Sequence, residues 1–262
     1  MYYEVHGEGE PLVVLHGGFG AVGMFARLLP ALVETRQVIV VELQSHGHTA
    51  DIDRPFSFEF MGDDIAALIS HLGHERAYVS GYSLGGGVAL QTAIRHPAKV
   101  RKLVIVSTPC KRDGWYPEVL AGMESIRAEE MADAFIHDAY LETAPNPEDW
   151  TKLADKSRRL LSEDYDWSED VAAMEAPTRE APTMEAPTMI VVGDADGVRT
   201  AHAVEFFELL GGGKADAGWD GSGMSDARLA ILPATTHYDI FSSPTLASTV
   251  APFLDAPMPE SE

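Results

Sequence analysis

Short apolar runs alternate with longer amphipathic stretches along most of the 262-residue chain. The runs have the length and the β-branched content of strands, whereas the stretches between them repeat apolar residues at helical spacing. Strands are predicted at residues 12–15, 38–41, 77–80, 103–106, 189–192 and 229–232. Helices are predicted at about residues 24–33, 63–71, 84–95 and 244–254. Continuous apolar strands that alternate with helices predict an α/β fold, with a mostly parallel central sheet covered by helices on both faces.

The strand pattern is interrupted between residues 111 and 174. Three tryptophans lie in this interval: Trp115, Trp150 and Trp167. Because its apolar residues recur at helical rather than alternating spacing, we interpret the interval as a small helical cap. The cap is then inserted into a core made of residues 1–110 and 175–262.

Three further segments depart from the strand and helix pattern. Residues 174–188 are three near-identical five-residue units that each end in Glu-Ala-Pro-Thr, and their prolines favour extended chain. We interpret them as a tandem duplication that lengthens the linker between cap and core, rather than as a partner-binding motif. The glycine-rich residues 211–226, with Trp219 near their centre, predict a long surface loop. The acidic residues 255–262 are predicted to be disordered.

Acidic side chains dominate the charged composition. The chain has 41 acidic and 19 basic residues and a formal net charge of -22. Such a surface repels phosphate backbones and anionic lipid headgroups, so nucleic acid and membrane-surface partners are not expected. A strongly anionic substrate would also approach against this field.

The first residues of the chain and its single cysteine bear on its compartment. Residues 1–6 lack the basic segment and apolar run of a signal peptide, and no apolar stretch approaches the length of a membrane span. Cys110 is the only cysteine, so neither an intrachain disulfide nor a Cys-rich metal site can form. The expectation is a cytoplasmic protein.

A candidate nucleophile follows the third predicted strand. Residues 81–85 read Gly-Tyr-Ser-Leu-Gly, and a helix begins directly after the serine. A strand that turns sharply into a helix holds this serine in a strained conformation at the carboxyl end of the sheet, beside the helix N-terminus. The alternative is a glycine-rich turn with an inert serine, but this context favours Ser83 as a nucleophile.

A serine hydroxyl needs a base to remove its proton at neutral pH. Most of the ten histidines lie beside early strands, at predicted helix ends or in the cap. His237 instead follows the last predicted strand, so it emerges at the carboxyl end of the sheet, where open α/β folds bind their ligands. His237 is therefore the predicted base.

A carboxylate should orient the imidazole through its other nitrogen. Residues 193–196, Gly-Asp-Ala-Asp, follow the fifth predicted strand to the same edge of the sheet. Both Asp194 and Asp196 are candidates: Asp194 could form a turn at the strand end, whereas Asp196 lies further into the loop. The chain order of serine, aspartate and histidine is the one expected when residues 81–85 form a nucleophile elbow.

Charge that develops on a substrate carbonyl oxygen needs hydrogen-bond donors. One predicted donor is the backbone amide of Leu84, directly after the nucleophile. The others are the amides of Gly18 and Phe19 in the glycine-containing loop after the first predicted strand, although these glycines could serve only chain reversal.

The motifs named so far resemble those of a known family. They are Leu-His-Gly-Gly at residues 15–18, Gly-Tyr-Ser-Leu-Gly-Gly at 81–86, Gly-Asp-Ala-Asp at 193–196 and Thr-His at 236–237. Together they resemble the α/β-hydrolase superfamily, particularly its small bacterial esterase-like members. The resemblance implies that Asp196, the second aspartate of its motif, is the acid of the triad. Epoxide hydrolases and haloalkane dehalogenases of this fold carry aspartate at the elbow, and Ser83 argues against both.

The chain departs from the family pattern in one loop. Where relatives often carry Asp-x-x-Gly-x-Gly, residues 42–48 read Glu-Leu-Gln-Ser-His-Gly-His. His46 and His48 could be mistaken for a pair of metal ligands, but no third ligand is evident, and neither a metal nor a cofactor is expected.

These features predict hydrolysis of a small carboxylic ester through an acyl-enzyme, with a small-molecule ester as the partner. A lactonase, a hydrolase of carbon–carbon bonds or a cofactor-free perhydrolase would use the same three residues. The sequence does not separate these activities, because their specificity lies in the side chains of the cap. A ligand-binding receptor with little turnover is the non-enzymatic alternative.

Overall fold

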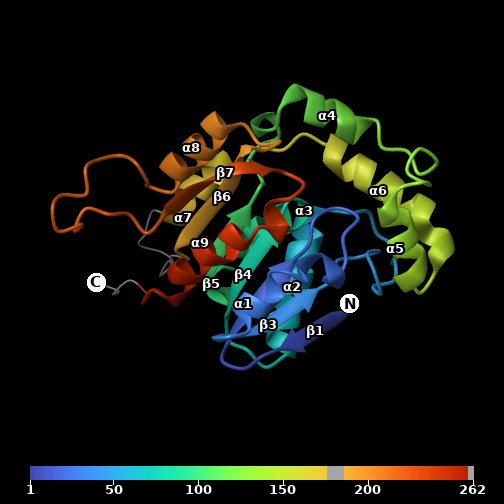
Figure 1. Ribbon diagram of the computed structural model, residues 1–262, viewed down its shortest axis with the longest axis horizontal. Coiled ribbons are helices and arrows are strands. Elements are labelled where there is room, and N and C mark those ends of the chain that lie inside the picture. Colours follow the sequence, from blue (N-terminus) through green and yellow to red (C-terminus); the bar gives the residue numbers. More distant parts are fainter. Residues whose placement is uncertain (176–185, 259–262) are drawn as a thin grey trace.

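A computed structural model describes residues 1–175 and 186–258 of the chain. Within these residues a seven-stranded sheet has the order β1-β3-β2-β4-β5-β6-β7 (Figure 1). The strands are β1 (Tyr3–His6), β2 (Glu10–Leu15), β3 (Arg36–Val41), β4 (Ala77–Tyr82), β5 (Val100–Val106), β6 (Thr188–Ala195) and β7 (Arg228–Thr236). Only β1 pairs antiparallel within this sheet, and the pairings from β3 to β7 are all parallel. The predicted α/β class and all six predicted strands are confirmed.

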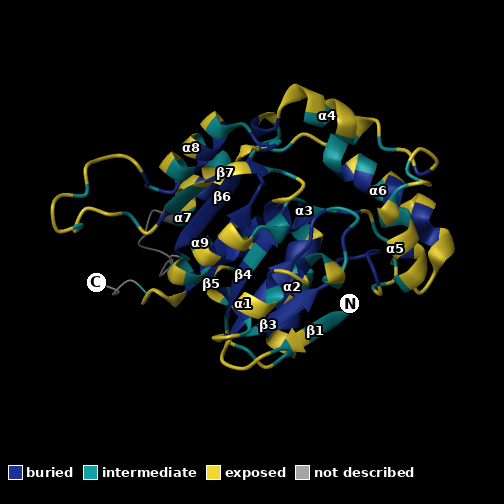
Figure 2. Ribbon diagram, in the orientation of Figure 1, coloured by how far each residue is buried: buried dark blue, intermediate teal, exposed yellow. Residues whose placement is uncertain are grey.

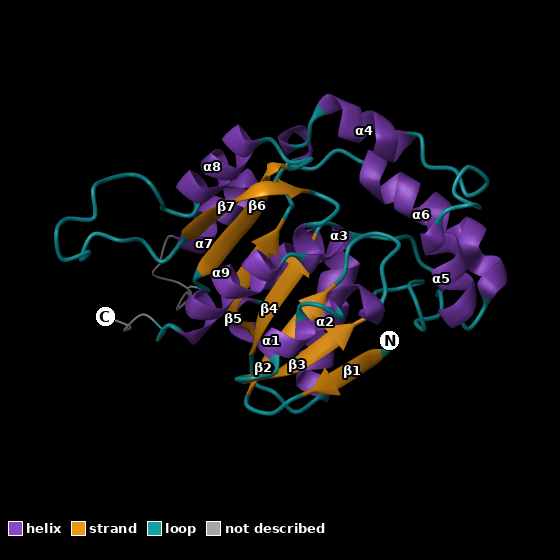
Figure 3. Ribbon diagram, in the orientation of Figure 1, coloured by secondary structure: helices purple, strands orange, loops and turns teal. Residues whose placement is uncertain are grey.

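Helices cover both faces of the sheet (Figure 3). They are α1 (Leu29–Leu32), α2 (Phe58–His71), α3 (Leu84–Arg95), α4 (Pro117–Glu124), α5 (Phe135–Thr143), α6 (Trp150–Ser162), α7 (Ser168–Glu175), α8 (Thr200–Leu209) and α9 (Pro244–Asp255). Alternate residues of each strand enter two separate apolar clusters, one packed on α2, α3 and α8 and the other on α1 and α9. Strands β2 to β6 are mostly buried between these layers (Figure 2), which explains their uninterrupted apolar sequence. The edge strands β1 and β7 are partly exposed.

Two elements near the start of the chain differ from the sequence analysis. Residues 24–33 do not form one helix, because Pro30 lies in their middle and cannot donate a backbone hydrogen bond; the chain forms a 3₁₀ turn over Val22–Phe25 and the single turn α1. Strand β1 was not predicted. It lies at the sheet edge, where its residues are only partly buried, so it lacks a continuous apolar run.

The interval between β5 and β6 contains α4, α5, α6 and α7. Helices α4, α5 and α6 arch away from the sheet, whereas α7 lies beside the core helices α3 and α8 (Figure 1). The ammonium of Lys156 on α6 joins the arch to the core, since its Nζ lies 2.7 and 2.8 Å from the two carboxylate oxygens of Asp51. The division into a cap of residues 111–174 and a core of 1–110 and 175–262 stays a prediction.

The irregular segments have different outcomes. Residues 176–185, which hold most of the repeat, lie outside the described residues, so its extended conformation is not addressed. Residues 211–226 form turns and coil before β7, and Trp219 is fully exposed there, which confirms the predicted surface loop. The tail prediction was wrong at Asp255, which ends α9 and pairs with Arg36; residues 259–262 are not described. Among the described residues no helix is both long and apolar enough to span a bilayer.

Candidate active site

Strained backbone conformations gather where the parallel strands end. Five non-glycine residues in the described part of the chain have a positive φ: Phe19, Ser45, Ser83, Ser107 and Ala234. The first four follow β2, β3, β4 and β5 within four residues, and the fifth lies near the carboxyl end of β7. Such conformations cost about 1–3 kcal/mol each and persist only where the surroundings enforce them. Their concentration at one edge marks this edge as the candidate site.

Ser83 occupies the sharp turn between β4 and α3. Its φ and ψ are 52° and −119°, and its amide donates to the carbonyl of Val106 at 2.9 Å. Side chains on the two flanking glycines would not fit, because a Cβ on Gly81 would lie 2.0 Å from the carbonyl oxygen of Gly85, and a Cβ on Gly85 would lie 2.5 Å from that of His16. The two glycines therefore allow the close packing that holds Ser83 at the end of its strand.

Ser83, His237 and Asp196 form one hydrogen-bonded chain. The Ser83 Oγ lies 3.1 Å from Nε2 of His237, and Nδ1 of His237 lies 2.9 Å from Oδ1 of Asp196. The imidazole is largely buried and the Asp196 side chain is completely buried. With the carboxylate accepting from Nδ1, Nε2 is left free to accept the serine proton. The structure thus brings together the three residues selected from the sequence.

Asp196 is held as a buried carboxylate by several donors. Its Oδ2 accepts from the Ser107 hydroxyl and from the Gly193 amide, and its Oδ1 accepts from the Val198 amide as well as from His237. Burial alone would raise the pKa of this carboxyl group, but the hydrogen bonds and the attraction of His237 hold the pKa below its ordinary value. Asp196 is therefore ionised at neutral pH despite its burial.

Asp194, the other aspartate left open by the sequence, has a different place. Its side chain is exposed and its Oδ1 accepts from the Thr235 amide at 3.2 Å. Backbone donors, those of Ala234 and Thr235 first, lower the pKa of its carboxyl group. Asp194 thus links the end of β6 to β7. Among the described residues, the aspartate that forms a hydrogen bond with His237 is Asp196 and not Asp194.

The three predicted oxyanion donors lie on two segments beside Ser83. Leu84 is the first residue of α3, so its amide has no partner within the helix. The loop after β2 passes close to Ser83, because a Cβ on Gly17 would lie 3.3 Å from the Cβ of Ser83. In this loop Phe19 has a φ of 59°, and its amide makes no hydrogen bond within residues 1–175 and 186–258. At Gly18 an added Cβ would meet open space.

Two residues that bear on the site were not identified from the sequence. Ser107 directly follows β5 and donates its hydroxyl to Asp196. Tyr82 donates its hydroxyl to the carbonyl of His237 at 2.7 Å, and burial raises the pKa of this phenol. The position of Ser107, a polar residue at the carboxyl end of a parallel strand, was an available signal. Nothing local in the sequence indicated the contact of Tyr82, because its partner is 155 residues away.

The loop that departs from the family pattern supports the segment after β2. The amide of Leu43 donates to Nε2 of His16 at 3.1 Å, so Nδ1 of His16 carries the proton and donates to the carbonyl of Gly17 at 2.7 Å. Nδ1 of His46 likewise donates to the carbonyl of Gln44 at 2.9 Å. Burial, and next the neighbouring His46, lower the pKa of His16 to about 3, while burial lowers that of His46 to about 4.

The pair His46 and His48 does not assemble with further ligands. His46 is fully buried, whereas His48 is exposed, and its Nδ1 lies 3.1 Å from the buried carboxylate of Glu42. No group of three or more His, Cys, Asp or Glu side chains in the described part of the chain is arranged to hold a metal ion.

The two buried histidines predict acid sensitivity. Because their folded pKa values lie below the ordinary 6.5, the unfolded chain binds protons that the folded protein excludes, and stability falls as the pH drops below 6.5. Between pH 7.5 and 5.5, each histidine should lower the free energy of unfolding by about 1.4 kcal/mol. In His46→Asn, whose amide can still donate to Gln44, the loss in unfolding free energy over this interval should be smaller than in wild type by about 1.4 kcal/mol. Urea unfolding at the two pH values measures the difference, and an equal loss in both proteins would contradict the assignment.

A second contact between a potential nucleophile and an imidazole is not reactive. The Cys110 Sγ lies 3.6 Å from Nε2 of His202, whose Nδ1 lies 3.2 Å from a carboxylate oxygen of Glu205. However, Nε2 already accepts the Cys110 amide at 3.2 Å, the thiol is fully buried, and burial raises its pKa to about 12. A thiol that stays protonated and out of reach is a poor nucleophile.

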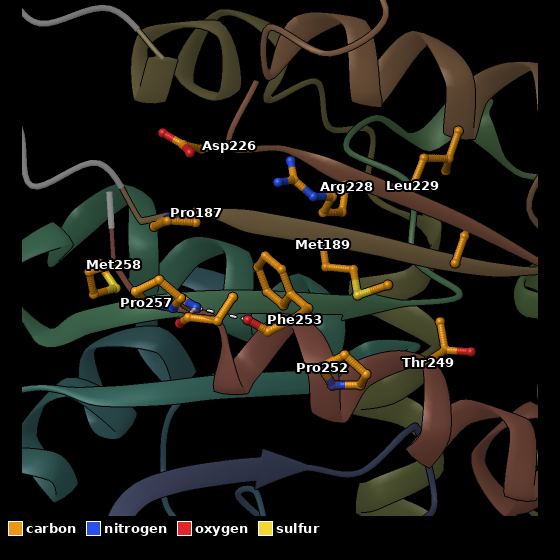
Figure 4. Close-up of a pocket in the computed structure, with 13 residues that line it drawn as sticks. Pro187, Met189, Asp226, Arg228, Leu229, Thr249, Pro252, Phe253, Pro257 and Met258 are labelled. Carbon is orange, nitrogen blue, oxygen red and sulfur yellow. Dashed lines mark hydrogen bonds between the residues drawn. The ribbon is translucent and has the colours of Figure 1, made fainter. Parts of the chain in front are cut away.

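A cavity of about 580 Å³ lies elsewhere on the molecule (Figure 4). Lys102, Met189 and Arg228 in its wall stand at or near the beginnings of β5, β6 and β7, and Phe253 comes from the end of α9. The cavity therefore opens at the amino ends of the strands, opposite the edge that carries Ser83. Lys102 is buried there, and its Nζ donates hydrogen bonds to the carbonyls of Phe253 and Ala256.

Comparison with known proteins agrees with this architecture. The chain matches the α/β hydrolase fold family over residues 10–186, and it belongs to this family. Among solved structures, the enol-lactonase from Burkholderia xenovorans LB400 superposes with a TM-score of 0.70 at 19% identity, covering 97% of this chain and 96% of that protein. At this identity the likeness concerns the fold.

Curated relatives align with shorter parts of the chain. A putative carbamate hydrolase RutD from Azorhizobium caulinodans is 32% identical over 115 residues, which cover 44% of this chain and 43% of that protein. A pimeloyl-[acyl-carrier protein] methyl ester esterase from Aeromonas hydrophila is 33% identical over 134 residues, which cover 48% of this chain and 50% of that protein. The aligned segments thus span half or less of these relatives.

Proposed function

We propose that this protein is a serine hydrolase that cleaves a small carboxylic ester through an acyl-enzyme. The observation that carries the proposal is the continuous hydrogen-bonded chain from Ser83 through His237 to Asp196. His237 removes the proton of Ser83 as its Oγ attacks the ester carbonyl, and Asp196 stabilises the imidazolium that forms. The names of the relatives, a carbamate hydrolase and a methyl ester esterase, support hydrolysis at a carbonyl carbon.

The tetrahedral intermediate places a negative charge on the former carbonyl oxygen. The amides of Leu84 and Phe19, which flank Ser83 from two segments, supply hydrogen bonds to this oxygen, and Gly18 leaves room for its approach. When the intermediate collapses, His237 returns the proton to the alcohol that leaves. A water molecule then attacks the acyl-enzyme with His237 again as the base, which releases the carboxylic acid and restores Ser83.

Two features of the protein bear on the proposed substrate. The Trp150 ring of α6 lies 5.6 Å from the Phe19 ring, so the helical arch touches the loop that receives the carbonyl oxygen. The net charge of -22 favours a neutral ester over an anionic one.

The proposal is tested with nitrophenyl esters of increasing acyl length, together with lactones, vinylogous 1,5-diketones and amides. We expect the acetate and butyrate esters to be turned over fastest, with a burst of up to one equivalent of nitrophenol, because the acyl-enzyme accumulates when deacylation is slower than acylation. If lactones or compounds with a cleavable carbon–carbon bond are turned over faster than the esters, they take the place of the ester as the proposed substrate class. Binding of the compounds without turnover of any would contradict the proposal and indicate a receptor.

A further inference from the structure

The imidazole of His237 is surrounded by three aromatic rings. The rings of Tyr82, Trp115 and Tyr238 lie 5.3, 5.4 and 5.4 Å from it between ring centroids. Tyr82 and Tyr238 are chain neighbours of Ser83 and His237 themselves. Trp115 instead comes from the segment that leaves the core after β5 and leads into α4. It is therefore the ring that reaches His237 from a separate part of the fold.

Trp115 is fixed in place on its far side. Its side chain is buried, and its indole Nε1 donates to the hydroxyl of Tyr165 at 3.1 Å. Tyr165 in turn stacks on Trp167 with the ring centroids 4.4 Å apart. The indole thus packs edge to face against His237, at an interplanar angle of 75°, from a rigid aromatic support.

The segment that carries Trp115 is also bonded to the loop of Asp196. The Tyr116 amide donates to the carbonyl of Gly197 at 3.0 Å, and the Arg199 amide donates to the carbonyl of Gly114 at 2.9 Å. An isolated antiparallel bridge pairs Trp115 with Val198. One short segment therefore contacts both the imidazole and the loop that holds its carboxylate.

We propose that Trp115 is a positioning residue that holds the His237 ring in the plane from which it reaches both Ser83 and Asp196. The inference rests on the proposed function. Hydrogen bonds of 3.1 and 2.9 Å on opposite ring nitrogens require a fixed ring orientation, and misplacement of a reacting group by about 1 Å can cost about 10²-fold in rate. A small side chain at position 115 leaves space beside the imidazole into which the ring can turn.

Trp115→Leu removes the ring, Trp115→Phe keeps a ring without the indole, and Trp219→Leu makes the same exchange at a fully exposed tryptophan. We expect Trp115→Leu to lower kcat for nitrophenyl acetate by about 10- to 100-fold with little change in KM. The rate of Ser83 labelling by a small fluorophosphonate should fall in parallel. Trp115→Phe should recover most of both rates, and Trp219→Leu should match wild type.

A double-mutant cycle with His237→Ala separates positioning from other roles. If Trp115 acts through the imidazole, Trp115→Leu should cause no further loss in the His237→Ala protein. An equal loss in both backgrounds, or a change confined to KM, would overturn the proposal. If Trp115→Leu does not fold, Tyr165→Phe takes its place, because it removes the hydroxyl that holds the indole while leaving Trp115 intact. An unchanged kcat in Tyr165→Phe would overturn the proposal equally. Absence of labelling and turnover in wild type would instead reject the proposed function.

Discussion

Replacement of Ser83 by alanine is expected to reduce ester turnover by about 10⁴-fold or more. The Ser83 Oγ lies within hydrogen-bonding distance of Nε2 of His237. Its removal takes away the proposed nucleophile and leaves only transition-state binding by the backbone donors. Steady-state kinetics with nitrophenyl acetate measure the loss. Since alanine must adopt the φ of 52° seen at this position, circular dichroism should accompany the kinetics.

The matched control for this variant is Ser248→Ala, on the exposed face of α9. It should retain full activity. A Ser83→Ala protein that keeps the wild-type fold and more than about a tenth of the wild-type rate would remove Ser83 from the mechanism.

Replacement of Asp196 by asparagine is expected to lower kcat by about 10⁴-fold. Both carboxylate oxygens accept from two donors each: Oδ1 from His237 and Val198, and Oδ2 from Ser107 and Gly193. An amide in either orientation turns its NH₂ group toward donors. If this group faces His237, it favours the tautomer in which Nε2 carries the proton and cannot accept that of Ser83. Kinetics at neutral pH should show the loss mainly in kcat.

Asp194→Asn provides a control two residues away on the same loop. Asp194 is exposed and accepts from the Thr235 amide, a role that the asparagine oxygen can keep. Its activity should stay within about tenfold of wild type. A larger loss in Asp194→Asn than in Asp196→Asn would mean that the wrong aspartate has been assigned.

Much of the candidate site could be predicted from the sequence, because short segments of the chain specify it. The elbow is specified by a strand, glycines at 81 and 85 and a helix that begins at Leu84, and each of these is visible within about twenty residues. The carboxyl ends of parallel strands share one edge, so the loops that hold Asp196 and His237 could be placed beside Ser83 without coordinates.

The remaining features depend on distant partners. Whether Asp194 or Asp196 meets the imidazole is decided by the irregular pairing of β6 with β7, where Gly193 lies opposite Leu232 but Ala195 lies opposite Thr236. The contact of Trp115 with His237 depends on the path that the chain takes after β5, which brings residue 115 back beside the core. Neither the register nor the return path leaves a periodic signal in the sequence. The edge strand β1 was missed because its four residues are only partly buried and form no continuous apolar run.

The account depends on Ser83 being made nucleophilic by the imidazole of His237. Intact-mass measurement after treatment with a fluorophosphonate tests this directly, because only an activated serine reacts readily with the reagent. We predict one adduct per wild-type chain, located on Ser83 by peptide mapping, no adduct in Ser83→Ala and a labelling rate in His237→Ala that is lower by orders of magnitude. Wild-type protein that stays unlabelled, or a His237→Ala protein labelled as fast as wild type, would contradict the account.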